Sequence, residues 1–312
     1  MAELKPYKGG YYLWQYLPST AAGGLFAALF ILGTAFICYK VFRTRMYYCI
    51  VFIIGGIFEI IGYCARAAAY DKTDVLMPYV IQSTLLLVAP ALFAASIYMT
   101  LGRVIRSVHA EARSLIPVKW LTTTFVCGDI FSFIVQASGA GLMVTGNSTQ
   151  LGENVILAGL IIQIVMFGLF ATVGAVFHVR LRRWPTGPFL NSRSTWTNTM
   201  IMLYTVSILI LVRSVFRVIE YAMGQSGYLL KHEWTLYVFD GVLMFAVVVM
   251  FGWLFPSHLV NVYPKDEEVV GQGPSDGERD PRTSTTIQMG YVNSSRSPVR
   301  GEVESTPVKY QG

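Results

Sequence analysis

Residues 198–223 read NTMIMLYTVSILILVRSVFRVIEYAM, an apolar run that is interrupted near its end by Arg213, Arg217 and Glu220. The spacings of four and three residues place these charges on one face of a helix. An arginine near the middle of a membrane-spanning helix is unfavourable by roughly 3 kcal/mol, so such charges need polar partners or water. This charged face is therefore the first place in the chain to look for function.

The rest of the chain has the composition of a membrane protein. It has 312 residues, of which 54% are hydrophobic and 13% are charged, and its mean hydropathy is +0.51. Soluble domains carry roughly 25% charged residues. Apolar segments long enough to cross the roughly 30 Å hydrocarbon core of a bilayer cover residues 17–39, 47–69, 79–102, 119–144, 154–179, 198–223 and 234–256. The sequence therefore predicts an all-α membrane protein with a bundle of seven transmembrane helices.

The distribution of lysine and arginine predicts the orientation of this bundle, because short cytoplasmic loops retain positive charge. One set of connections contains Lys40, Arg43, Arg45, Arg103, Arg106, Arg113, Lys119, Arg180, Arg182, Arg183 and Arg193. The opposite set contains Lys72 and Lys231. With seven spans, we expect the N-terminus outside and the C-terminus in the cytoplasm.

Three regions follow from this topology. Residues 1–16 form an extracellular N-terminal arm, residues 17–256 the membrane domain, and residues 257–312 a disordered cytoplasmic tail rich in Pro, Gly, Ser and Thr. The basic excess lies in the membrane domain, which fits contact with an anionic leaflet rather than with nucleic acid. Asn147 begins an Asn-Ser-Thr sequence in an outer connection and is a glycosylation candidate.

Polar residues within or at the ends of the apolar spans are the candidate site. They are Glu59, Arg66, Asp129, Gln136, Gln163, Arg213, Arg217, Glu220, Glu233 and Asp240. At a rise of about 1.5 Å per residue, Glu59 lies near the midplane and Asp129 in the inner half, while the arginines, Gln163, Glu220 and Asp240 lie in the outer half. This depth pattern predicts a polar cavity open to the outer leaflet. The alternative is that the charges only pair between helices and hold the bundle together.

The numbers of intramembrane acids and arginines indicate that the charges do more than pair with each other. Glu59, Asp129, Glu220 and Asp240 outnumber the three intramembrane arginines, so at least one carboxylate lacks an arginine partner. Such a carboxylate is either protonated by burial or ready for a cation or an amine.

Several enzyme and cofactor chemistries are excluded by missing motifs. No G-x-x-x-x-G-K-[ST] phosphate loop occurs, which argues against an ATP-driven pump within this chain. The last span has no lysine for a retinal Schiff base. Of the four histidines, His109, His178 and His258 lie at inner helix ends and His232 lies on the outer side, so they assemble no obvious metal site. We therefore expect neither catalysis nor a cofactor.

An ordered set of motifs runs through the spans. They are Glu59-x-x-Gly62-Tyr63-x-x-Arg66, Ala89-Pro90 with Ala94-Ala95 and Tyr98, Asp129-x-x-Ser132-x-x-x-Gln136-x-x-Gly139, Gly159-Leu160-x-x-Gln163, Arg213-x-x-x-Arg217-x-x-Glu220-x-x-x-Gly224 and His232-Glu233-x-x-x-Tyr237-x-x-Asp240. In this order, over roughly residues 11–260, the set resembles the fungal lipid-translocating exporter family. These proteins are also called RTA-like, after resistance to aminocholesterol.

The resemblance implies a multi-pass protein of a fungal plasma membrane that exports, or moves outward, sphingoid long-chain bases and related amphiphilic toxic compounds. Its partners would then be membrane lipids and the amphiphile itself. Glu59, Glu220 and Asp240 are our candidates for binding the ammonium group, and Gln136 and Gln163 for binding hydroxyl groups. The arginines would orient the carboxylates or bind a lipid phosphate.

Two other functions agree with seven spans. A seven-helix receptor has the same topology, although this chain lacks Asp-Arg-Tyr after the third span and Asn-Pro-x-x-Tyr in the seventh. A membrane stress-response regulator would use the charges only for packing and the tail for recruiting partners. The identity of the lipid, the energy source of transport and the oligomeric state stay open at this point.

Overall fold

The computed structural model describes residues 18–70, 75–108, 117–144, 149–183, 193–223 and 233–256. The predicted N-terminal arm, the predicted tail and the glycosylation candidate Asn147 lie outside these ranges.

Seven segments of the described chain are helical, long and apolar enough to cross a membrane. They are α1 (Thr20–Thr44), the short η2 (Tyr47–Cys49) with α2 (Ile50–Ala68), α3 (Leu76–Ser107), α4 (Val118–Val144), α5 (Thr149–Arg183), α7 (Arg193–Ala222), and the consecutive α9 (Glu233–Leu236), η4 (Tyr237–Val242) and α10 (Leu243–Trp253). No strand occurs in the described ranges. The predicted fold class, a seven-helix membrane bundle, is confirmed.

Helix ends differ from the predicted spans by up to five residues, most clearly in α1, α3, α5 and α7. The apolar segment at 154–179 predicts a shorter helix than α5, which runs from Thr149 to Arg183. Hydropathy marks only the part of a helix that lies in hydrocarbon, whereas helical hydrogen bonding continues into the polar residues on either side.

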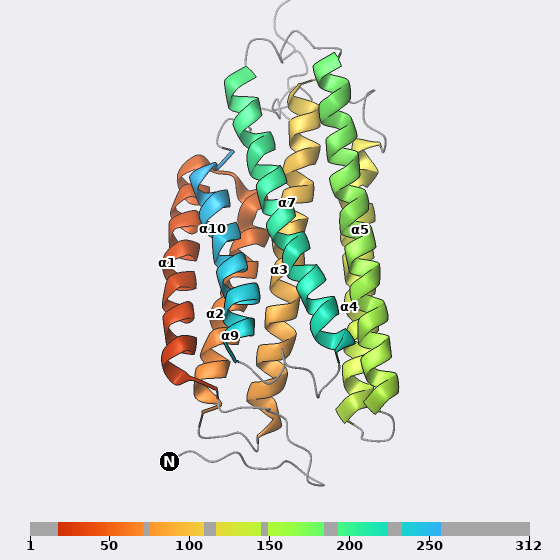
Figure 1. The fold of residues 1–312 in the computed structure, drawn as a ribbon. Coiled ribbons are helices and arrows are strands. Elements are labelled where there is room, and N and C mark those ends of the chain that lie inside the picture. The colour runs from red at the N-terminus through yellow and green to blue at the C-terminus, as the bar shows by residue number, and fades with distance from the viewer. Residues whose placement is uncertain are drawn as a thin grey trace, which may run out of the picture. The chain divides into compact units, whose positions relative to one another are not determined.

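The helices of the membrane domain lie side by side, from α1 at the left of Figure 1 to α4 and α5 at the right, and their contacts close into a ring. Around the ring, α1 contacts α2, α2 contacts α3, α3 contacts α4, α4 contacts α5, α5 contacts α7, α7 contacts α10, and α10 contacts α1. Helices α3 and α7 also contact each other. These two helices therefore separate α1, α2 and α10 from the pair formed by α4 and α5.

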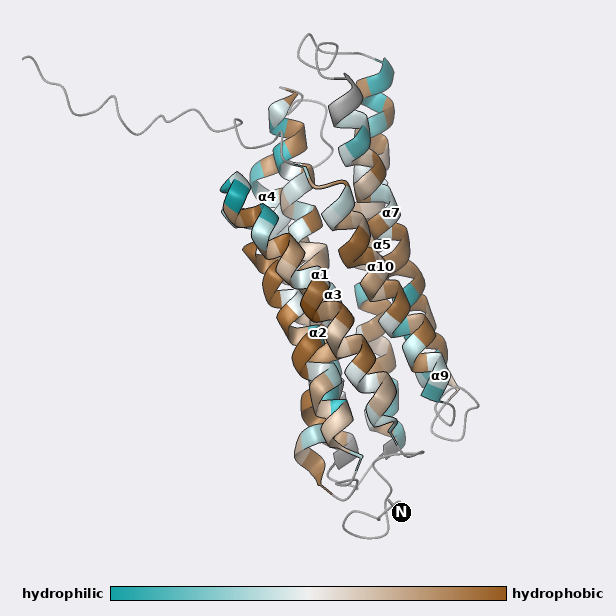
Figure 2. Cartoon of the chain, turned by 90° about the vertical axis from the view of Figure 1, so that its left-hand side faces the viewer, coloured by the Kyte–Doolittle hydropathy of each residue, from teal (hydrophilic) through white to brown (hydrophobic). Residues whose placement is uncertain are grey.

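The outside of the bundle is apolar. Figure 2 shows that the middle parts of the helices are mostly hydrophobic and that hydrophilic residues gather toward the helix ends. Large apolar side chains such as Leu32, Phe131 and Ile208 are exposed by 69%, 58% and 60%. A soluble monomer rarely exposes apolar surface on this scale, but lipid covers it without cost. The chain is a multi-pass membrane protein.

Aromatic stacking fixes the helices around the candidate site. The ring of Phe52 on α2 lies 4.4 Å from that of Phe93 on α3 and 4.1 Å from that of Phe251 on α10. Tyr63, one turn beyond Glu59 on α2, stacks on Phe26 and Phe30 of α1 at 5.4 and 5.5 Å. These contacts hold the polar face of α2 toward the interior, where Glu59 and Arg66 are fully buried.

Candidate functional site

The charges of α7 meet Asp240 of the seventh helix in the interior of the bundle. Arg213 donates from Nε to Asp240 Oδ1 at 2.7 Å, and Arg217 donates from Nη2 to Asp240 Oδ2 at 2.6 Å. Arg217 also donates from Nη1 to Glu220 Oε2 at 2.9 Å. Together with Glu59, which interacts electrostatically with Asp240 and both arginines, these residues form what we call the central charge cluster.

Arg213 has a further partner on α3, the backbone carbonyl of Leu86. Its Nη2 donates to this oxygen at 2.7 Å. Pro90 lies four residues after Leu86 within α3, and a proline has no N–H to donate to the carbonyl of residue i−4. The guanidinium therefore replaces the missing helical donor, and the proline and the arginine act as one unit.

Glu59 differs from the other acids of the central charge cluster because neither of its carboxylate oxygens makes a hydrogen bond within the described part of the chain. Its exposed fraction is 0%. Asp240 is held by two arginines and Glu220 by one, and both arginines are already paired. Three carboxylates against two guanidinium groups leave one excess negative charge, and the geometry assigns it to Glu59.

A second group of charges, which we call the helix-end cluster, joins α2 to the start of the seventh helix. Arg66 donates from Nε to the Tyr237 hydroxyl and from Nη2 to Glu233 Oε1, both at 2.9 Å. The Tyr237 hydroxyl also donates to Glu233 Oε1 at 3.2 Å, and the backbone N–H of Ser19 donates to the same oxygen at 2.8 Å. Glu233 therefore ties α1, α2 and α9 together.

The seventh helix contributes an acid to each cluster, and its hydrogen-bond pattern changes between the two acids. Residues Tyr237–Val242 form a π-helix, a local widening of the helix that is frequent at functional sites. In a regular α-helix, Glu233 and Asp240, seven residues apart, would share one face. In the structure they meet different arginines, Arg66 for Glu233 and Arg213 with Arg217 for Asp240.

The remaining candidates form a separate polar group between α3, α4 and α5. The Tyr98 hydroxyl donates to Asp129 Oδ2 at 3.0 Å, and Gln136 Nε2 donates to Gln163 Oε1 at 3.2 Å. Gly159 makes this pairing possible, since a Cβ there would lie 2.6 Å from Gln136 Cγ. No hydrogen bond or ion pair among the described residues joins this group to the central charge cluster.

The structure thus divides the predicted site into parts that sequence spacing cannot separate. The central charge cluster contains Glu59, Arg213, Arg217, Glu220 and Asp240, while Arg66 and Glu233 lie beside it in the helix-end cluster. Asp129, Gln136 and Gln163 lie on the other side of the bundle.

Four participants are absent from the set of predicted site residues: Tyr237, Tyr98, the Leu86 carbonyl and the backbone N–H of Ser19. Tyr237 and Tyr98 could have been predicted, because each is a tyrosine within an intramembrane polar motif. The Leu86 carbonyl could have been predicted from Pro90, which lies four residues later and cannot donate to it.

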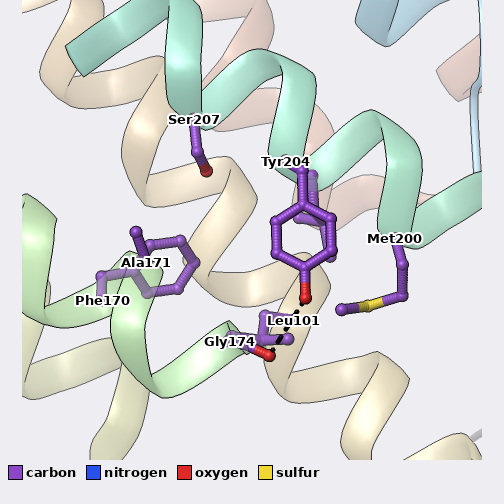
Figure 3. Close-up of a pocket in the computed structure, with 8 residues that line it drawn as sticks. Leu101, Phe170, Ala171, Gly174, Met200, Tyr204 and Ser207 are labelled. Atoms are coloured by element: carbon purple, nitrogen blue, oxygen red, sulfur yellow. Dashed lines mark hydrogen bonds between the residues drawn. The ribbon is translucent and has the colours of Figure 1, made fainter. Parts of the chain in front are cut away.

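One small pocket is described between α3, α5 and α7 (Figure 3). Its lining consists of Leu101, Phe170, Ala171, Gly174, Met200, Leu203, Tyr204 and Ser207. Its free volume of about 10 Å³ suits roughly one water molecule rather than a lipid head group. None of the predicted site residues lines it. Within the described ranges, no group of three or more His, Cys, Asp or Glu side chains is arranged to hold a metal ion.

Comparison with known proteins identifies the chain's relatives. Residues 52–262 match the family described as "RTA1 like protein". The chain belongs to the RTA1-like family. The match runs from α2 to beyond α10 and therefore includes every residue of the three polar groups except Ser19 on the N-terminal side.

Several relatives are from Saccharomyces cerevisiae. The chain is 36% identical to Protein RTA1 over 84% of its own length and 90% of the relative. It is 36% identical to Protoporphyrin uptake protein 1 over 78% of its own length and 91% of that protein. It is 27% identical to the Sphingoid long-chain base transporter RSB1 over 67% of its own length and 64% of that protein. No solved structure is significantly similar to this chain.

Proposed function

We propose that this RTA1-like protein exports sphingoid long-chain bases, or amphiphiles of the same kind, across the plasma membrane. The observation that carries the proposal is the carboxylate of Glu59, which is buried within the membrane domain and has no arginine partner. The name of RSB1, a sphingoid long-chain base transporter related to this chain, supports the same substrate class.

The chemistry of a sphingoid base suits this site. Its ammonium group carries one positive charge, which matches the excess negative charge of the central charge cluster. Its hydroxyl groups need hydrogen-bond partners of the kind that an amide side chain provides. Its alkyl chain can stay in lipid, along the apolar outer faces of the helices. Among our three candidates for the ammonium, Glu59 is favoured over Glu220 and Asp240, because arginines already occupy those two.

Entry of the ligand needs an opening of the packed charges. We expect this opening at Arg217, since its side chain is 15% exposed whereas those of Arg213 and Asp240 are 1% exposed. Separating the Arg217–Glu220 pair would uncover the central charge cluster while leaving Arg213 anchored on α3.

A second candidate is the movement of anionic amphiphiles such as porphyrins, which carry carboxylates. The observation that favours it is the 36% identity to Protoporphyrin uptake protein 1, which exceeds the identity to RSB1. Substrate carboxylates would then bind Arg213 and Arg217. The charge balance favours the cationic substrate, because these arginines already pair with Asp240 and Glu220.

Transport by the purified protein in liposomes tests both proposals. We expect the wild type to move a labelled sphingoid base between leaflets and Glu59→Ala to lose this activity. The matched control is Glu153→Ala, a partly exposed acid on α5, which should retain it. Movement of protoporphyrin but not of the base would support the second candidate. Movement of neither, with a ligand-dependent response of a bound signalling protein, would support a receptor.

A further inference from the structure

Glu59 lies in an enclosed environment in which neighbouring oxygen atoms also lack partners. The hydroxyls of Tyr63 on α2 and Thr34 on α1 are buried and make no hydrogen bond in the described part of the chain. Thr34 lies against Gly56, where a Cβ would be 2.3 Å from its Oγ1, and Leu86 of α3 lies against Gly62. The face of α2 that carries Glu59 is therefore closed by α1 and α3 on its two sides.

The charged groups that act on Glu59 come from two other elements. Asp240 belongs to η4, and Arg213 and Arg217 belong to α7. Tyr63 is the further titratable neighbour on α2 itself. Glu220 completes the set through its pair with Arg217. An ionised Glu59 would add a third negative charge to this set, with no hydrogen bond to stabilise it and no water contact at 0% exposure.

We propose that Glu59 is a proton-binding site and that its carboxyl group carries a proton in the described conformation. A proton brings the central charge cluster to zero net charge, with Arg213 and Arg217 against Asp240 and Glu220. A proton needs only the Glu59 carboxylate to bind it, and no further coordinating group.

A metal cation fits this position less well than a proton. Cations such as Ca²⁺ and Mg²⁺ need about six or more oxygen ligands at short range. Glu59 makes no contact of hydrogen-bond length with another described polar atom, and no group of three or more His, Cys, Asp or Glu side chains within those ranges could hold a metal ion.

Protonation of Glu59 has a consequence that rests on the proposed function. A proton and a substrate ammonium carry the same charge, so either one neutralises the cluster but both together do not. The ammonium would bind as the carboxyl proton leaves to water, and the proton would return as the ammonium leaves. One proton would thus move inward for each base moved outward, and the charge buried in the membrane would stay constant.

Two measurements on the full-length protein in lipid test this inference. The first is the infrared absorption of protonated carboxylic acids, measured as the difference between the wild type and each variant. We expect Glu59→Gln to lose a band that Glu153→Gln keeps, because any contribution of Asp129, the other buried carboxyl group without an arginine among the described residues, is common to both. If Glu59→Gln fails to fold, Glu59→Asp should keep the band and shift its frequency. Persistence of an unaltered band in the folded Gln variant, or absence of any such band in the wild type, would overturn the proposal.

The second measurement is proton release on addition of an N-trimethyl sphingoid base, which has no proton of its own to lose. We expect about one proton per bound ligand from the wild type, since binding and proton release are linked, and none from Glu59→Gln. Binding without release would overturn the exchange. A band that depends on Glu59 in a protein that moves no base in liposomes would refute the proposed function but leave the proton site standing. Transport of the base by a protein that lacks the band would refute the proton site but leave the proposed function standing.

Discussion

Arg213 on α7 donates a hydrogen bond of 2.7 Å to the backbone carbonyl of Leu86 on α3, the carbonyl that Pro90 leaves without a helical donor. A carbonyl in hydrocarbon without a donor is unfavourable, and so is an arginine there without acceptors. Each satisfies the other, and Asp240 neutralises the charge. This contact also fixes the two helices that separate the two sides of the bundle, so the central charge cluster and the crossing of α3 with α7 form together.

Replacement of Arg213 by leucine should lower stability strongly. It leaves the Leu86 carbonyl without a donor and removes one of the two cations at Asp240, and breaking a buried ion pair costs about 3–5 kcal/mol. The double variant Arg213→Leu with Asp240→Leu should be more stable than the sum of the single effects predicts, because Arg217 and Glu220 then still balance. Thermal unfolding in detergent measures both. Strictly additive losses would show that the two residues are not coupled.

The Tyr237 hydroxyl should contribute measurably to the helix-end cluster. Tyr237→Phe keeps the ring, which lies 5.0 Å from the Arg66 guanidinium, but removes the acceptor of Arg66 Nε. Loss of a buried hydrogen-bond partner costs about 1–3 kcal/mol. Tyr39→Phe is the matched control, because it removes an arginine–tyrosine hydrogen bond that is exposed. Its effect should be near zero, and equal effects of the two variants on the melting temperature would contradict the assignment.

Gly159 and Gly168, both on α5, should respond oppositely to alanine. At Gly159 a Cβ would lie 2.6 Å from Gln136 Cγ and 2.9 Å from the Ser132 carbonyl oxygen, whereas nothing lies within 4 Å at Gly168. Gly159→Ala should destabilise the protein by about 1–3 kcal/mol through overpacking. Gly168→Ala should be neutral or slightly stabilising, since alanine favours the helix by roughly 0.5–1 kcal/mol. Comparison of the two melting temperatures checks this, and similar values would argue against the close contact of α4 and α5.

Loop charge predicts the orientation of the bundle, and this prediction can be tested in cells. An epitope tag on the N-terminal arm should be stained in intact cells, and a tag at the C-terminus only after permeabilisation. The reverse staining pattern would show that the bundle has the opposite orientation, with the helix-end cluster at the cytoplasmic side. Both tags can be carried by one protein, so each serves as the control for the other.

Single-residue pairing was less predictable than the fold. The excess of acids over arginines already indicates that some carboxylate is without an arginine, and the structure identifies two, Glu59 and Asp129. Asp129 accepts a hydrogen bond from Tyr98 instead. Arg66 is seven residues from Glu59 on the same helix but pairs with Glu233, a residue 167 positions away. Spacing gives the face on which a residue lies, but it gives no information about which helix faces it.

The sequence by itself determined the seven spans, their apolar outer faces and the list of polar residues that must point inward. Each of these depends on local properties, namely hydropathy, helical period and the free energy of placing a charge in hydrocarbon. Only the tertiary structure decided that Asp240 pairs with both Arg213 and Arg217, that Glu233 and Asp240, separated by the start of a π-helix, bind different partners, and that Glu59 is left without an arginine or a hydrogen bond in the described part of the chain. These outcomes depend on distances between helices remote in sequence, and a shift of one helical turn in packing would exchange the partners without changing any local pattern.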